Sequence, residues 1–247
     1  MAETNTYLDL VRTFTSFLTV AIHTIIYERN IYPATTFLSA RAYNFSVRQS
    51  RHPRVCKWIT DAVCAVEVEL LKGSAEKIAV VIYDAQDTAL ERFMFDVSRF
   101  PVVPASEHLT PLERRDDKGE KLTVLPMGDL EEQMRATMAR LGECGALLRP
   151  VPEGCSFTVV VELKEESEPP IGHPQAWIPV QPALQKTIMR GEDGRHVERG
   201  AELGGNKVTP LRSVAAGEMM FEMWIEEGKT KFEEQPASSL GSSVEAT

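Results

Sequence analysis

The stretch YLDLVRTFTSFLTVAIHTIIYERN, from Tyr7 to Asn30, carries helical periodicity over its whole length. Its apolar residues recur at steps of three and four, the spacing of one helix face: Tyr7, Val11, Phe14, Leu18, Ala21, Ile22 and Ile25. Leu10, Phe17 and Ile26 widen that face, so we expect a central helix that packs on more than one side. Pro33 prevents the helix from continuing.

Two further helices follow from the same kind of pattern. The second is expected from about Pro53 to Leu71, where the sequence KGS places a basic residue and a glycine at its end. The third is expected from about Asp129 to Leu148. Its inward face would consist of apolar residues at helical spacing: Leu130, Met134, Met138, Leu141 and Leu148.

Strands are predicted between and after these helices. TTFLSARAYNF (35–45) is typical of a hairpin or an irregular edge. KIAVVIYD (77–84) and ALERFMFDV (89–97) are typical of an antiparallel pair joined by AQDT. In the second of these strands Phe93, Phe95 and Val97 would share one face, with Glu91, Arg92 and Asp96 in solvent-compatible positions. CSFTVVVEL (155–163), KVTPLRSV (207–214) and EMMFEMWIEEG (218–228) complete an α+β fold.

The last strand places a tryptophan on an outer face. Met219, Phe221, Met223 and Ile225 alternate with Met220, Glu222, Trp224 and Glu226, so if the first set faces the core, Trp224 stands among glutamates. An aromatic side chain in such a position is typical of an interface anchor. The alternative is that another part of the chain covers Trp224.

Composition restricts the class of protein. The formal charge of −9 over 247 residues argues against tight, unaided binding to nucleic acid, because that affinity comes mainly from cations that neutralise phosphates. No targeting segment or uninterrupted membrane span is visible, so we expect a cytosolic or nuclear protein. The cysteines form no CxxC pair, which disfavours zinc and favours buried thiols: Cys56, Cys64, Cys144 and Cys155.

Three segments are expected to lack regular structure. Residues 100–126 hold four prolines and the charge run ERRDDKGEK, typical of a mobile loop. More than forty residues after 163 lose regular patterning, and they include GHPQAWIPVQP (172–182), where Trp177 sits among three prolines. Trp177 either fills a gap in the core or belongs to a segment that closes over a ligand. Beyond Gly228 the chain is polar and rich in serine, which predicts disorder.

No sequence motif indicates an enzyme. GxxxxGK[ST], GxGxxG after a strand, HExxH and GxSxG are all absent, and RGEDGRHVERG (190–200) is interpreted as a flexible loop. His23, on the apolar first helix, is interpreted as a core histidine, and His52, before Pro53, as a cap or turn residue. We therefore expect no catalytic residues, no metal site and no cofactor.

Several segments, in this order, resemble the HORMA-domain family: FLTVAIHTIIYERNIYP, YNFSVRQSRHPRVCKWI, EKIAVVIYD, ERFMFDV, GCSFTVVVEL, AWIPV and TPLRSV with MMFEMWIEEG. The resemblance covers about Tyr7 to Gly228 and is greatest to the branch of accessory, non-catalytic subunits of DNA polymerase zeta. It implies one HORMA domain over 1–228, with three helices on an antiparallel sheet. The same resemblance makes about 164–228 a C-terminal safety belt and leaves 229–247 as a disordered tail.

The resemblance also implies partners and sites. Trp58 and Trp177 match positions where the belt grips a Pro-containing peptide of the polymerase zeta catalytic subunit, with tryptophan at 58 where tyrosine is familiar. Val208, Glu222 and Trp224 match the surface that receives the C-terminal domain of a translesion scaffold polymerase, a deoxycytidyl transferase, where leucine, glutamine and tyrosine are familiar.

Dimerisation and function follow from the same resemblance. Arg135 matches a basic residue at a HORMA homodimer or heterodimer interface, while its local interpretation is an ion pair with Glu131. The expected function is a non-catalytic adaptor of translesion DNA synthesis in DNA repair, located in the nucleus, with the cytoplasm as a second location. A spindle-checkpoint or meiotic HORMA protein that binds another closure motif is the first alternative, and an enzyme with an unrecognised site is the second. The segments 100–126 and 182–207 are longer than in familiar members.

Overall fold

In the computed structural model of the protein, the residues described are 5–164 and 205–232. The elements occur in this order: α1 (Tyr7–Glu28), η1 (Ala34–Thr36), β1 (Phe37–Ala42), β2 (Phe45–Ser50), α2 (Pro53–Lys72), β3 (Ala75–Tyr83), β4 (Ala89–Asp96), η2 (Ala105–Glu107), β5 (Arg114–Arg115), β6 (Lys121–Leu122), α3 (Met127–Gly142), α4 (Cys144–Leu147), β7 (Ser156–Leu163), β8 (Gly205–Ala216), β9 (Met219–Gly228) and η5 (Lys229–Lys231).

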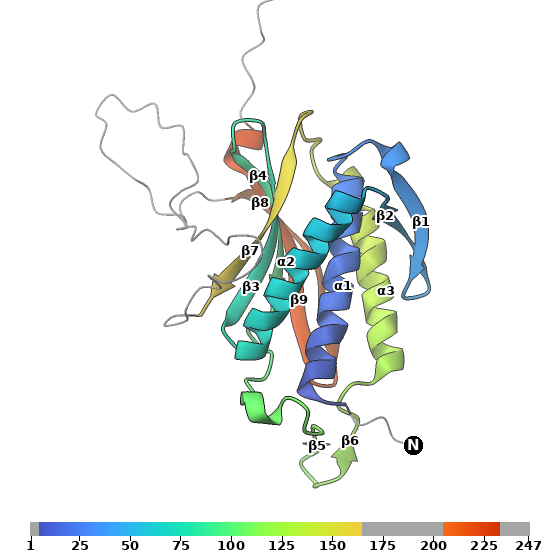
Figure 1. Ribbon diagram of the computed structural model, residues 1–247, viewed down its shortest axis with the longest axis vertical. Coiled ribbons are helices and arrows are strands. Elements are labelled where there is room, and N and C mark those ends of the chain that lie inside the picture. Colours follow the sequence, from blue (N-terminus) through green and yellow to red (C-terminus); the bar gives the residue numbers. More distant parts are fainter. Residues whose placement is uncertain (1–4, 165–204, 233–247) are drawn as a thin grey trace, which may run out of the picture.

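One five-stranded sheet forms the centre of the fold, in the order β7-β3-β4-β9-β8, and every neighbouring pair is antiparallel. The three long helices cover one face of this sheet, with α1 between α2 and α3 (Figure 1). The β1–β2 hairpin forms a separate two-stranded sheet beside them. This arrangement confirms the predicted α+β fold with three helices on an antiparallel sheet.

Helix α1 is the central helix, as its periodicity predicts. It starts with a capping box between Thr6 and Asp9, which satisfies backbone N–H groups at its first turn. The ring of Phe14 contacts Phe95, Phe100 and Phe221 edge-on, with centroids 5.2 to 6.5 Å apart. The helix is long and apolar enough to cross a membrane by length and composition, but two thirds of that window is buried in the fold, as in a core helix.

The ends of α2 follow their sequence signals. Pro53 occupies the first turn, where its missing N–H costs nothing, and Gly73 ends the helix in the left-handed region at φ 72°. His52 stands at the N-cap position, although its side chain makes no capping hydrogen bond.

His23, on α1, is a satisfied core residue, since its Nδ1 accepts a bond of 3.3 Å from the Ser50 N–H. Burial lowers the pKa of His23.

The structure corrects four expectations. The third helix ends at Gly142, and the short α4 follows before the buried Leu148. Within 100–126, η2 and the β5–β6 hairpin form, and the Leu112 N–H donates to the Asn5 carbonyl beside α1. The tail expected from residue 229 begins with η5.

The fourth correction concerns Glu91, which is buried rather than solvent-compatible. Alternate residues of a strand share a face, so Glu91 lies on the same face as Phe93 and Phe95. Arg92 and Asp96, on the opposite face, are half-buried and keep contact with solvent, which agrees with the solvent-compatible positions predicted for them.

Candidate functional site

Strand β7 forms one margin of the sheet. It pairs with β3 along one side, and within residues 5–164 and 205–232 no strand pairs with its other side. An unpaired edge presents a row of N–H and C=O groups that another extended chain can bind. This free edge is the geometric basis of the candidate site.

An aromatic cluster, defined by Tyr32, Trp58 and Phe157, lies beside the β7 edge. The rings of Trp58 and Phe157 meet edge-on with centroids 5.0 Å apart, and those of Tyr32 and Phe157 with centroids 6.4 Å apart. All three side chains are half-buried, and burial raises the pKa of Tyr32. Partly exposed aromatic faces beside an unpaired strand edge can hold apolar side chains of an extended peptide.

Each ring of the aromatic cluster is positioned by a different element. Tyr32 follows the end of α1, just after Asn30, whose φ of 52° turns the chain. Trp58 lies in the second turn of α2, and Phe157 is the second residue of β7. The sequence identified Trp58 through the resemblance but missed its contact with Phe157. Trp177, the other predicted peptide residue, lies outside the described residues.

The three residues predicted for the second partner share the outer face of the sheet, opposite the helices. We define the outer-face patch as Val208, Pro210, Glu222 and Trp224. In the register Trp224 stands opposite Pro210 on β8 and Met94 on β4, while Val208 stands opposite Glu226. The structure therefore brings Val208, Glu222 and Trp224 together on β8 and β9.

Trp224 is half-buried. Its ring packs on a small apolar cluster whose buried members are Ala79, Val81 and Met94. Its Nε1–H donates a bond of 2.8 Å to Glu226 Oε1. The sheet thus covers part of the ring, as the alternative interpretation allowed. Val208 remains 58% exposed beside it. The core-facing set of β9 is buried as predicted.

Charged side chains surround the outer-face patch. Arg92 lies 2.6 Å from Glu162 and 3.7 Å from Glu226, and Arg99 lies 3.8 Å from Glu222. All of these side chains keep contact with solvent, so each pair contributes only about 0 to 1 kcal/mol. They give the patch a charged rim around an apolar centre, the usual anatomy of a protein interface.

Arg135 lies half-buried on α3, and its ion-pair partner is Glu132 rather than the predicted Glu131. Both acids are one turn away, so the spacing alone could not choose between them. Nearby, the Gln133 side chain exchanges two hydrogen bonds of 2.8 Å with the backbone of Ala215. Gln133 therefore ties α3 to the β8 edge, two residues from Arg135.

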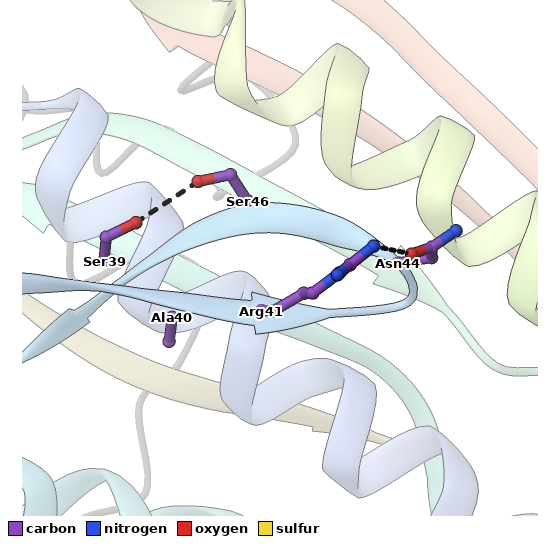
Figure 2. Close-up of a pocket in the computed structure, with 5 residues that line it drawn as sticks. All are labelled: Ser39, Ala40, Arg41, Asn44 and Ser46. Atoms are coloured by element: carbon purple, nitrogen blue, oxygen red, sulfur yellow. Dashed lines mark hydrogen bonds between the residues drawn. The ribbon is translucent and has the colours of Figure 1, made fainter.

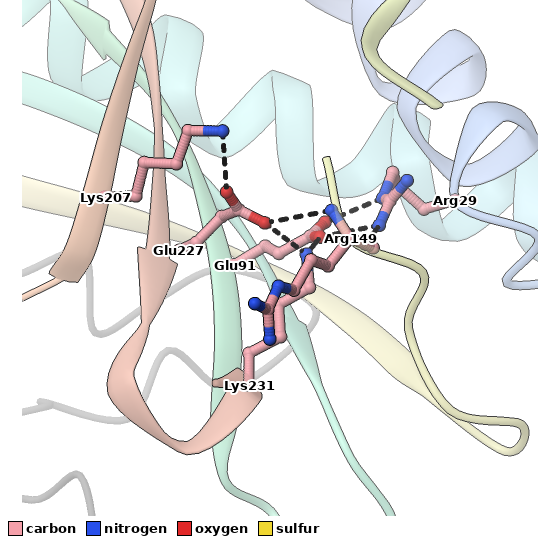
Figure 3. A network of polar contacts seen from close by, with 6 residues as sticks. All are labelled: Arg29, Glu91, Arg149, Lys207, Glu227 and Lys231. Carbon is pink, nitrogen blue, oxygen red and sulfur yellow. Dashed lines mark hydrogen bonds and ion pairs between the residues drawn. The ribbon is translucent and has the colours of Figure 1, made fainter. Parts of the chain in front are cut away.

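A network of buried charges lies where β4 begins and β9 ends, at the opposite end of β9 from the contact with Gln133 (Figure 3). Glu91 accepts two bonds from the Arg29 guanidinium, at 2.7 and 2.8 Å, and also contacts Lys231. Lys231 Nζ donates to Glu227 at 2.6 Å. We call Arg29, Glu91, Glu227 and Lys231 the buried charge network, and each is at most 3% exposed. The sequence pattern missed it.

Two further features lie away from these surfaces. An open depression on the β1–β2 hairpin is lined by Ser39, Ala40, Arg41, Asn44 and Ser46 (Figure 2). In the part of the chain that the structure describes, no three His, Cys, Asp or Glu side chains gather as metal ligands. All four cysteines are free thiols. Cys144 and Cys155 are buried as expected, whereas Cys56 is half-buried and Cys64 exposed, against the expectation. Burial raises the pKa of Cys144 to about 12.

Known proteins resemble this chain in both sequence and fold. The HORMA domain family model matches residues 11–186. The mitotic spindle assembly checkpoint protein MAD2B of Danio rerio is 29% identical over 220 residues, which cover 87% of this chain and 89% of that protein. The DNA polymerase zeta processivity subunit of Schizosaccharomyces pombe is 32% identical over 213 residues, or 86% and 90% of the two chains.

Solved structures agree with this likeness. A chain of the mitotic checkpoint complex aligns with a TM-score of 0.64 at 18% identity, over 92% of this chain and 98% of that one. The C. elegans protein HTP-2, bound to the HIM-3 closure motif, aligns with a TM-score of 0.58 at 13% identity, over 91% and 92% of the two chains. Because the family model matches most of the chain and the fold is the same, this chain belongs to the HORMA domain family.

Proposed function

We propose that this chain is the adaptor of a translesion DNA polymerase zeta, acting in the nucleus. As a HORMA domain protein related to polymerase zeta processivity subunits, it is a non-catalytic subunit. In our proposal it clamps a Pro-containing peptide of the catalytic subunit at the free β7 edge, beneath the safety belt of about 164–228. The outer-face patch binds the C-terminal domain of the scaffold polymerase, so that one domain bridges two polymerases.

One observation carries the clamp: the aromatic cluster lies beside an edge of β7 that no strand among residues 5–164 and 205–232 occupies. An extended peptide that adds to β7 would satisfy the backbone groups of that edge, while aromatic faces would hold its prolines. A belt that closes over the peptide would slow its release. Trp177 is the proposed belt residue over the peptide.

The clamp predicts that Trp58→Ala weakens binding of the catalytic-subunit peptide by about 1 to 3 kcal/mol, as is usual for a hot-spot aromatic. Trp177→Ala is expected to do the same. Trp58→Phe keeps a ring against Phe157 and is expected to retain most of the affinity. Isothermal calorimetry with the Pro-containing peptide measures all three variants.

Trp224→Ala is the matched control for the clamp, since it removes the same side chain from the opposite face of the sheet. It is expected to leave peptide affinity unchanged. Unchanged affinity in Trp58→Ala and Trp177→Ala together would refute the clamp. A peptide from a checkpoint or meiotic closure motif belongs in the same titration, and preferential binding of that peptide would support the first alternative function instead.

The second surface predicts the opposite pattern for the scaffold polymerase. Trp224→Ala is expected to weaken capture of its C-terminal domain by about 2 kcal/mol or more, roughly thirtyfold, because the exposed part of the ring would be buried on binding. Val208→Ala would add to the loss. A ternary pull-down with the peptide and the C-terminal domain separates the two sites. If Trp224→Ala also lost the peptide, the two-surface model would be wrong.

Arg135 is the proposed dimer residue. Arg135→Ala is expected to shift a dimer toward monomer while changing the free energy of unfolding by no more than about 0.5 kcal/mol. Its side chain is 41% exposed, and its one ion-pair partner among the described residues, Glu132, is exposed as well. Sedimentation across a concentration series measures the shift. Glu132→Ala breaks the same ion pair but leaves Arg135 in place. An equal shift toward monomer in both variants would show that the ion pair matters, and not a direct contact of Arg135 with the partner.

A further inference from the structure

Residues 29–60 have a charge opposite to that of the whole chain. They contain six Arg and Lys residues and no Asp or Glu, a formal charge of +6, in a protein whose total is −9. Arg29 belongs to the buried charge network. The other five cations are exposed, and we call them the basic strip: Arg41, Arg48, Arg51, Arg54 and Lys57.

The basic strip runs from the β1–β2 hairpin into α2. Arg41 stands opposite Ser46, and Arg48 opposite Ser39, so the two arginines project from the same hairpin face. From Arg48 onward the cations recur every third residue, through the end of β2 and the first two turns of α2. Figure 2 shows Arg41 beside Asn44, with Ser39 and Ser46 further along the hairpin.

Several other arginines of the protein have acidic partners that, among the described residues, the arginines of the basic strip lack. Arg99, Arg114, Arg115 and Arg135 each lie within 4 Å of a carboxylate. In the described ranges, no ion pair involves any arginine of the basic strip. Arg48 instead covers the Tyr27 ring, 5.1 Å from its centroid. Lys57 pairs with Asp61, whose side chain is mostly covered, but the Lys57 side chain itself is 74% exposed and can still reach an incoming anion.

The density of cations favours a polyanion with closely repeated charge. At about 3.3 Å per residue before α2 and 1.5 Å within it, Arg48 to Lys57 extend over at most about 23 Å. A nucleic-acid strand presents several phosphates over that length, one per 3.4 Å or so of helix axis. Guanidinium groups bind phosphate oxygens in bidentate fashion. An acidic peptide would need a carboxylate at nearly every turn to match this density.

We infer that the basic strip binds the phosphate backbone of nucleic acid, without reading its sequence. The acidic remainder of the chain opposes this binding, so the contact is weak alone and becomes useful when partners hold the protein close to DNA. The strip shares no residue with the aromatic cluster or the outer-face patch. A loss of nucleic-acid binding is therefore distinguishable from a failure of the peptide clamp.

The test uses the full chain and fluorescently labelled DNA of about 20 nucleotides, single-stranded and duplex, at salt concentrations from about 50 to 200 mM. The logarithm of the affinity is expected to fall linearly with the logarithm of the salt concentration. Four to five neutralised phosphates require a slope of about −3.5 to −4.5 on duplex and about −3 to −3.5 on single-stranded DNA. The triple variant Arg48→Gln, Arg51→Gln and Arg54→Gln is expected to bind at least about tenfold more weakly at low salt. The magnitude of its salt slope is expected to fall by about 2 on single-stranded DNA and by nearly 3 on duplex.

Arg114→Gln with Arg115→Gln is the matched control, because it removes two exposed arginines that have acidic partners. It is expected to leave DNA binding unchanged. Circular dichroism and peptide calorimetry confirm that the triple variant stays folded and keeps the clamp. The inference is overturned if the wild-type chain does not bind DNA at the lowest salt, if the triple variant binds like wild type, or if a glutamate polymer of equal charge competes as well as DNA.

Discussion

Glu91→Ala is expected to lower the free energy of unfolding by about 3 to 5 kcal/mol, because it leaves Arg29 and Lys231 buried without their shared carboxylate. In the intact network two cations and two carboxylates balance one another. Arg29 Nη2 also donates to the Arg149 carbonyl at 2.5 Å, but a neutral acceptor does not replace the lost charge. Urea unfolding followed by circular dichroism measures the change.

Glu162→Ala is the matched control for Glu91. Its carboxylate also has two cationic partners, Arg92 and Lys77, but it is 35% exposed. Water can solvate the cations that remain, so the expected cost is no more than about 1 kcal/mol. If both variants lowered the free energy of unfolding equally, burial would not explain the large contribution of the network to stability.

A double variant tests how the network is coupled. Glu91→Ala with Lys231→Met removes one charge of each sign from the buried charge network. Arg29 and Glu227 remain as its buried cation and carboxylate. The combined loss is expected to be smaller than the sum of the single losses by about 0.5 to 3 kcal/mol, as is usual for residues in one network. Additive losses would show that Glu91 and Lys231 act independently.

Gly217→Ala is expected to lower the free energy of unfolding by about 2 to 4 kcal/mol, through backbone strain and overpacking together. Gly217 has a φ of 64°, and an added Cβ would lie 1.9 Å from the Val124 carbonyl oxygen and 2.7 Å from Pro126 Cδ. These are atoms of a backbone and of a rigid ring, so they cannot swing aside. The turn between β8 and β9 would have to move away from the segment before α3.

Gly154→Ala separates the two contributions. Gly154 has a φ of 82°, yet an added Cβ meets nothing within 4 Å. Only the cost of the left-handed backbone remains, about 1 kcal/mol or a little more. The difference between the two variants therefore measures the steric clash at Gly217. A loss in Gly154→Ala as large as that in Gly217→Ala would show that the clash contributes nothing.

The buried charge network has a structural consequence for the end of the chain. Lys231 lies in η5, directly after β9, and contacts Glu91 on β4 and Glu227 on β9. The guanidinium of Arg149, before β7, lies 4.4 Å from the centroid of the Phe232 ring. These contacts hold the residues after Gly228 against the sheet, which is why the expected tail does not begin there.

The sequence by itself determined the elements whose signals are local. Proline and glycine positions marked the ends of α1 and α2, and the alternation in β9 assigned its core face, because dihedral restrictions and side-chain periodicity act over a few residues. The segments quoted for the HORMA resemblance added Trp58, Val208, Glu222 and Trp224 as candidates. The structure places the last three on one face of the sheet.

Only the tertiary structure decided which distant residues meet. Glu91 is buried because Arg29, 62 residues before it, and Lys231, 140 residues after it, supply its counter-charges. The contact of Trp58 with Phe157 likewise joins a helix to the margin of the sheet. Periodicity contains no information on such pairs, since a glutamate in a strand has the same local pattern whether water or a buried cation solvates it. The packing of α1 and η5 around β4 determines that buried cations, and not water, solvate Glu91.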